Sequence, residues 1–127
     1  MTTEKIIENV LTLSDADRQR VIDAILADRK GRRAQQALQV AQLYGGIVDG
    51  LHTGRRWARC MISWQMRLDG FVQREIAPAL GVDKSCISYD WSNFAVVTSR
   101  PHLFPDECAA WEKFNQKLND YVSKRNS

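Results

Sequence analysis

The sequence has 127 residues, of which 44% are hydrophobic and 26% are charged. These values are typical of one soluble globular domain and argue against wholesale disorder. No aliphatic or aromatic run is longer than the four residues of 94–97, whereas a membrane span needs about 20 apolar residues. The amino end carries Glu4 and Glu8, where a secretion signal would be basic and then apolar. We therefore expect a cytoplasmic protein with no membrane partner.

The cysteines are three in number, and none belongs to a C-x-x-C pair. This spacing encodes neither a disulfide framework nor a four-cysteine zinc site. We interpret all three as structural thiols: Cys60, Cys86 and Cys108.

The net charge of +3 is distributed unevenly along the chain. Residues 1–28 carry a charge of −3, whereas residues 29–68 carry +7. Seven of the eight bases in the second segment are arginines, whose planar guanidinium suits phosphate oxygens and guanine edges better than an ammonium does. Charge alone leaves two interpretations open, a polyanionic partner or a solvated helix face followed by an arginine-rich hinge.

Apolar spacing in the first half of the chain predicts three helices. The first covers about residues 6–11, and the second begins after Ser14 as the N-cap and ends at Gly31, so that the two form a helical hairpin. The third covers residues 34–44 and ends at Gly45-Gly46. Its alanine-rich face is predicted to pack against a neighbouring helix or against a second copy of the chain. Residues 47–54 form either a loop or a short helix.

The second half of the chain predicts four further helical segments. Their limits are about residues 56–68, 73–80 and 84–97, with a last helix that begins at Pro105. The sequence contains no alternation of apolar and polar residues long enough to predict a strand. The fold class is therefore all-α, a single helical domain of about six helices, with residues 1–46 as an amino-terminal hairpin and third helix and residues 47–127 as the second region.

Residues 73–89 match the steric requirements of a helix-turn-helix. Ile76 and Leu80 face the core, Ala77 is small at the helix crossing, Gly81 suits the positive φ of a tight turn, and Ile87 buries the second helix. In that register one polar face of the second helix points outward. Its residues are the candidates for contact with base edges in a major groove: Asp83, Lys84, Ser85, Ser88, Tyr89 and Ser92.

Two residues depart from this pattern. Pro78 lies inside the first helix of the unit and is expected to kink it, and Asp90 occupies a position expected to be apolar, where Trp91 would pack instead. A helical hairpin that only packs therefore remains an alternative.

The segment from Thr53 to Val97 resembles the carboxy-terminal DNA-binding domain of the bacterial replication initiator DnaA, within the Trp-repressor-like helix-turn-helix group. The resemblance covers 45 residues and rests on four motifs: T-G-R-R-W-A-R, M-R-L-D-G-F, R-E-I-A-P-A-L-G and D-K-S-C-I-S. It implies that arginines of the basic loop enter the minor groove, and that the start of the last motif helix reads the major groove. Lys84 and Cys86 replace the family's usual histidine and second threonine, and no phosphate-binding ATPase loop occurs in the chain.

Carried over by position, the resemblance assigns phosphate or minor-groove contact to Arg55, Arg56 and Arg59. Trp57 lies among these arginines and is a candidate for stacking on a sugar or base, although a tryptophan on that helical stripe is more typical of a core. We therefore expect a double-stranded DNA-binding protein with a regulatory or mobile-element role, possible homodimerisation, and no cofactor.

No pattern indicates catalysis. His52 and Cys60 are separated by a glycine-rich segment, and a mixed set at residues 102, 106 and 108 is weak evidence for a metal. We expect neither an enzyme nor a metal site. The alternative function is a helical adaptor or antitoxin-like interaction module that does not bind DNA.

Overall fold

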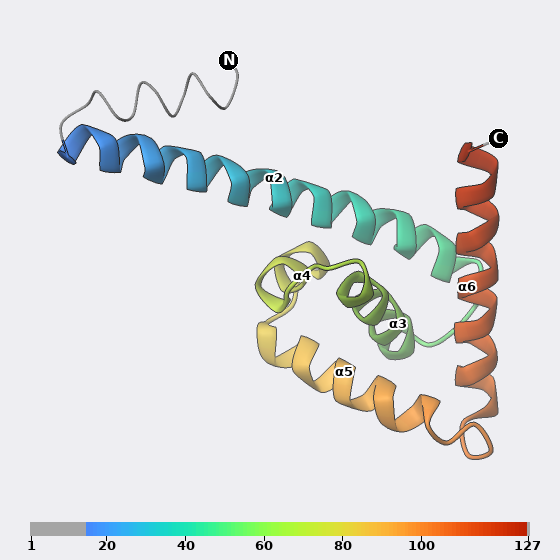
Figure 1. Cartoon of the computed structure of the whole chain (residues 1–127). Coiled ribbons are helices and arrows are strands. Elements are labelled where there is room, and N and C mark those ends of the chain that lie inside the picture. The colour runs from blue at the N-terminus through green and yellow to red at the C-terminus, as the bar shows by residue number, and fades with distance from the viewer. Residues whose placement is uncertain (1–14, 127) are drawn as a thin grey trace. The chain divides into compact units, whose positions relative to one another are not determined.

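The computed structural model describes residues 15–126 and is helical throughout its regular structure, with no strand in that range (Figure 1). This confirms the all-α fold class. The helices are α2 (Asp15–Asp49), α3 (Arg55–Leu68), α4 (Gln73–Leu80), α5 (Lys84–Thr98) and α6 (Pro105–Asn126). Within the described range, no helix is both long enough and apolar enough to cross a membrane.

Helix α2 is continuous from Asp15 to Asp49, so the predicted breaks at Gly31 and at Gly45-Gly46 are wrong. Residues 47–49, left undecided between loop and helix, are its last residues. A glycine costs about 1 kcal/mol in a helix interior, which weakens a helix without breaking it. The apolar spacing continues across Gly45-Gly46, because the buried residues of this stretch lie on one face of the helix: Ala37, Ala41, Tyr44 and Val48. The first predicted helix and the proposed N-cap at Ser14 lie outside the described residues.

The chain divides into two compact units, residues 1–35 and residues 36–127. The described part of the first unit is helical, and its side-chain contacts include a hydrogen bond from Gln19 to Asp23 and an exposed ion pair between Arg20 and Asp17. Among the residues whose burial the structure describes, the hydrophobic core cluster lies in the second unit. Residues 36–46 therefore belong to the same unit as residues 47–127, although they were expected to belong with the amino-terminal hairpin.

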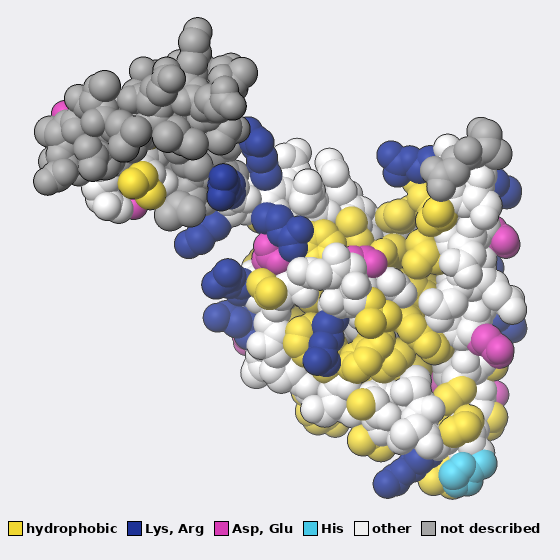
Figure 2. Space-filling view, viewed as in Figure 1, with side chains coloured by type: hydrophobic (Ala, Val, Ile, Leu, Met, Phe, Trp, Pro, Cys, Tyr) yellow, Lys and Arg dark blue, Asp and Glu magenta, His cyan; other side chains and the backbone are white. Residues whose placement is uncertain are grey.

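The core of the second unit is built around Phe94 of α5. Its ring stacks on Trp57 at 5.4 Å and on Trp64 at 4.6 Å between ring centroids, and it meets Trp111 edge-on at 4.8 Å. Aromatic pairs in these geometries stabilise a core beyond their buried area. Helices α3, α5 and α6 are thus joined through one aromatic cluster. Figure 2 shows further hydrophobic side chains gathered between α3 and α6.

Helices α4 and α5 are joined by the predicted three-residue turn. Gly81 adopts the left-handed conformation, with φ of 69°, and the Val82 N–H donates to the Ala77 carbonyl at 3.0 Å. Ile76 and Ile87 are fully buried on either side of the turn. The limits predicted for α4 and the positive φ predicted at Gly81 are therefore confirmed, and α4 extends to Leu80 with Pro78 inside it.

Two glycine substitutions are expected to change stability in opposite directions. Gly81→Ala should lower the free energy of unfolding by about 1 kcal/mol, because a Cβ disfavours the left-handed conformation. Gly46→Ala should raise it by roughly 0.5–1 kcal/mol, because alanine is the better helix former. A Cβ added at either position meets no atom within 4 Å, so backbone conformation alone separates the two. Urea unfolding measures both, and a shift of the same sign in the two variants would contradict this account.

Candidate functional site

The outward face of α5 is open to solvent. Asp83 is the N-cap residue of the helix, but its carboxylate forms no capping hydrogen bond, so its oxygens remain available to an external donor. All six side chains predicted to read DNA are exposed: Asp83, Lys84, Ser85, Ser88, Tyr89 and Ser92. The register predicted for this helix is therefore correct, because the buried residues Ile87, Phe94 and Val97 occupy the opposite face.

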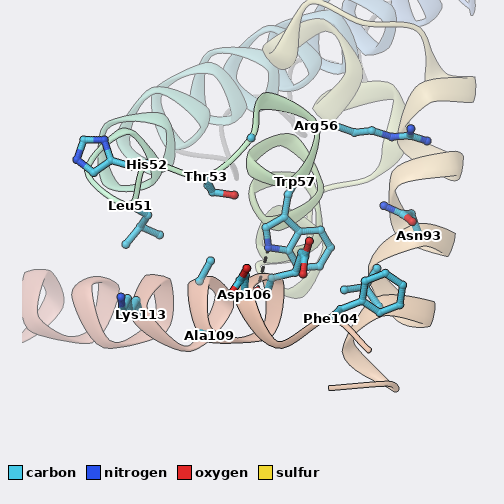
Figure 3. Close-up of a pocket in the computed structure, with 14 residues that line it drawn as sticks. Leu51, His52, Thr53, Arg56, Trp57, Asn93, Phe104, Asp106, Ala109 and Lys113 are labelled. Carbon is cyan, nitrogen blue, oxygen red and sulfur yellow. Dashed lines mark hydrogen bonds between the residues drawn. The ribbon is translucent and has the colours of Figure 1, made fainter. Parts of the chain in front are cut away.

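Arg55 and Arg56 occupy the first turn of α3 and are both exposed. The guanidinium carbon of Arg56 lies 4.6 Å from the centroid of the Tyr89 ring on α5, a cation–π contact. Figure 3 shows the Arg56 side chain extending from α3 toward α5. The structure therefore brings Arg56 of the predicted basic segment to the predicted reading face of α5.

Arg59 points into the molecule. Its Nε atom donates to Oδ2 of Asp90 at 2.6 Å, and its Nη2 atom donates to Oδ1 at 3.2 Å, a bidentate pair. The Asp90 side chain is fully buried, and the Arg59 side chain is 32% exposed. The hydrogen bond to Asp90 raises the pKa of the Arg59 guanidinium, which keeps the cation in place. Arg59 is therefore committed to an internal ion pair, and this corrects its expected role in DNA contact.

The same ion pair explains why a carboxylate occupies a position expected to be apolar. Asp90 is tolerated there because Arg59 of α3 neutralises it. Trp91 lies beside it, half-buried, and donates its indole N–H to the Ser63 carbonyl at 3.2 Å. Trp91 thus packs next to Asp90 and does not replace it.

Trp57 belongs to the core. It is buried, stacks on Phe94, and donates its indole N–H to the Glu107 carbonyl of α6 at 3.0 Å (Figure 3). A side chain held on its face and at its polar edge is not free to stack on a nucleotide. The predicted alternative of a core tryptophan is confirmed, and Trp57 is removed from the contact residues.

A cleft of about 690 Å³ opens beside Trp57 in the second unit. It is bounded by residues 51–54, the first turn of α3, α5 and the amino-terminal half of α6 (Figure 3). Arg56 and Lys113 contribute positive charge to its lining, and Asp106 and Glu107 contribute negative charge. With both signs present, the cleft has no net preference for an anion.

Cys60 lies next to the buried ion pair and has the environment of a structural thiol. It is fully buried, and burial raises its pKa to about 11, although a hydrogen bond from the Asn93 amide opposes the shift. A thiol with a raised pKa is a poor nucleophile at neutral pH. Among the described residues, no three His, Cys, Asp or Glu side chains gather as a metal site.

Two arginines were not singled out from the sequence. Arg74 shares a shallow groove of about 340 Å³ with Lys84, although it lies in a segment with net negative charge. Arg67, at the end of α3, lies over two tryptophan rings. Trp64 precedes Arg67 by one helical turn, but the contacts of Arg67 with Trp91 and of Arg74 with Lys84 join different helices, so neither charge counting nor helical spacing could have found those two.

The two partners of the buried ion pair are expected to differ in how much stability is lost when each is removed. Arg59→Ala leaves the Asp90 carboxylate buried without its cation and should cost about 3–5 kcal/mol. Asp90→Ala leaves a guanidinium that is partly exposed and can regain water, so the loss should be smaller. Chemical unfolding measures both, with exposed Arg55→Ala as the control, expected within about 0.5 kcal/mol of wild type. Equal stability of Arg59→Ala and Arg55→Ala would contradict the structural role of Arg59.

No protein-family model matches the sequence, and neither a curated protein nor a solved structure matches it.

Proposed function

We propose that this protein binds double-stranded DNA, with the outward face of α5 in the major groove and with Arg55 and Arg56 on phosphates or in the minor groove. The observation that carries the proposal is the position of Arg56, whose guanidinium lies against Tyr89 at the edge of an exposed, serine-rich helix face. A cationic group beside an uncovered polar helix is the arrangement that groove binding requires. The resemblance of residues 53–97 to the DNA-binding domain of the replication initiator also supports it.

The side chains on this face suit base edges. Lys84 can donate to guanine O6 and N7, the Asp83 carboxylate can accept from cytosine N4, and serine hydroxyls can pair with either kind of edge. The amino-terminal end of α5 carries the first two of these residues, and it is the end that enters the groove in helix-turn-helix proteins. We infer that this face supplies sequence discrimination.

The arginines supply the part of the affinity that does not depend on sequence. Asp83 is exposed beside Lys84, so the start of α5 has little net positive charge with which to hold phosphates. Arg55 and Arg56 provide that charge from α3, and no ion pair within residues 15–126 occupies either guanidinium. Phosphate contacts release counterions and make the affinity depend on salt.

The first test measures this salt dependence on a duplex selected from random sequences. Binding of the wild-type chain should weaken steeply as salt rises. Arg55→Ala combined with Arg56→Ala should lower the magnitude of the slope of log K against log salt by about 1.8, because each lost phosphate contact accounts for about 0.9. Fluorescence anisotropy at several salt concentrations gives the slope.

The matched control removes two positive charges elsewhere. Arg100→Ala combined with Lys117→Ala lowers the net charge equally, at exposed positions in the α5–α6 turn and on α6, and should leave the slope near the wild-type value. Equal slopes in the two double variants would reject the arginine contacts. No binding of the wild-type chain at low salt would reject DNA binding and favour the protein-interaction module.

Homodimerisation remains a separate prediction. The alanine face of α2 that suggested it is buried inside the chain at Ala37 and Ala41, while Leu38 is 45% exposed. If a second copy docks at this exposed part of α2, sedimentation at tens of micromolar should show a dimer and Leu38→Glu should give a monomer. A wild-type monomer under those conditions would remove the prediction.

A further inference from the structure

Arg67 lies in the last turn of α3, at the opposite end of the helix from Arg56. Its guanidinium carbon lies 5.0 Å from the centroid of the Trp64 ring and 4.7 Å from that of the Trp91 ring. The side chain is exposed, and within the described range no carboxylate forms an ion pair with it. Stacking occupies the faces of a guanidinium and leaves its in-plane N–H groups available to an acceptor. Arg67 is therefore a positioned cation without an anionic partner in residues 15–126.

A shallow groove of about 310 Å³ opens at this guanidinium. Its lining includes Arg67, Trp91, Gln73, Ser88, Ser92 and Ala95, with no carboxylate among the lining residues. Gln73 donates its side-chain amide to the Ser88 hydroxyl oxygen, so the hydroxyl proton of Ser88 can be donated elsewhere. The groove thus combines a cation with hydroxyl donors, the groups that bind a phosphate oxygen.

The two arginines lie on opposite edges of the outward face of α5. At 100° per residue, Tyr89 and Trp91 are separated by an outward arc of about 160° around the helix, and Ser85, Ser88 and Ser92 lie on that arc. Arg56 is stacked on the first ring and Arg67 on the second. Their positions on α3 differ by eleven residues, a rise of about 16 Å. The major groove is about 12 Å wide, which is less than this separation of the two backbone positions, so two arginine side chains on either side of α5 can extend to the phosphates of opposite edges.

We propose that Arg67, with Ser88 and Ser92, forms a second phosphate-binding site, which holds the DNA strand opposite the one held by Arg56. The inference rests on the proposed DNA binding and adds to it. In this arrangement Arg56 and Arg67 contact phosphates of the two strands, and α5 lies between the two arginines in the groove. The ligand of the groove is a phosphodiester of the duplex backbone, so the contact is independent of base sequence.

The experiment compares single variants by the salt dependence of binding to the same duplex. Arg67→Ala should reduce the magnitude of the slope by about 0.9, which makes the loss of affinity between 50 and 200 mM salt about 3.5-fold smaller than in the wild type. Arg67→Lys, which keeps the charge, should retain the wild-type slope. Arg100→Ala, an exposed arginine outside this face, is the control for net charge. Circular dichroism establishes that each variant is folded.

Phosphate-ethylation interference then tests the geometry. Arg56→Ala should lose interference at phosphates of one strand, and Arg67→Ala should lose it at phosphates of the other strand. A wild-type slope in Arg67→Ala, or loss on the same strand in both variants, would overturn the second site and leave DNA binding by Arg55 and Arg56 intact. A wild-type chain that binds no duplex at low salt would instead remove the proposed function, and the second site with it.

Discussion

The packing of α5 against α3 is the constraint on which the rest of the second unit depends. Its polar element is the bidentate pair between Arg59 and the fully buried Asp90, and its apolar element is the stacking of Phe94 on Trp57 and Trp64. A buried carboxylate is costly unless a cation meets it in good geometry. The pair therefore disfavours any rotation of α5 that would separate the two groups, and the aromatic stack favours the same orientation.

The orientation of the outward face follows from this packing. Once Asp90, Phe94 and Val97 are turned toward the core, the serines of α5 lie on the opposite side. Tyr89 and Trp91 then lie at the two edges of that face, where Arg56 and Arg67 stack on them. The same interface that stabilises the fold thus determines which cations flank the exposed helix.

The arginines of α3 differ in role because they differ in position around one helix. Arg59 faces α5 and forms an ion pair with Asp90, whereas Arg56 and Arg67 lie at the two edges of the outward face of α5 and remain exposed. Their guanidiniums are held by aromatic rings, which limits the side-chain entropy lost when a phosphate is bound. Charge counting treats all three as equivalent, and only their neighbours distinguish them.

Local signals in the sequence were sufficient for the helices of the second half and for the face of α5. Asp69-Gly70 ends α3, Gly81 supplies the left-handed turn, and Pro105 with two acids begins α6, because these preferences arise within a few residues of backbone. The glycines of α2 predicted breaks that do not occur, for the complementary reason. Their local cost is small, and burial of Ala37, Ala41, Tyr44 and Val48 in the core outweighs it.

The sequence by itself determined the helical class, the turn between α4 and α5, and the set of polar residues that α5 exposes, since each depends on short-range periodicity and turn chemistry. Tertiary structure alone decided the partner of Asp90, the burial of Trp57 and the placement of Arg67 beside Ser88 and Ser92. Each of these joins helices that are distant in the chain. Their physical origin is side-chain packing between elements, which no spacing within one element can specify.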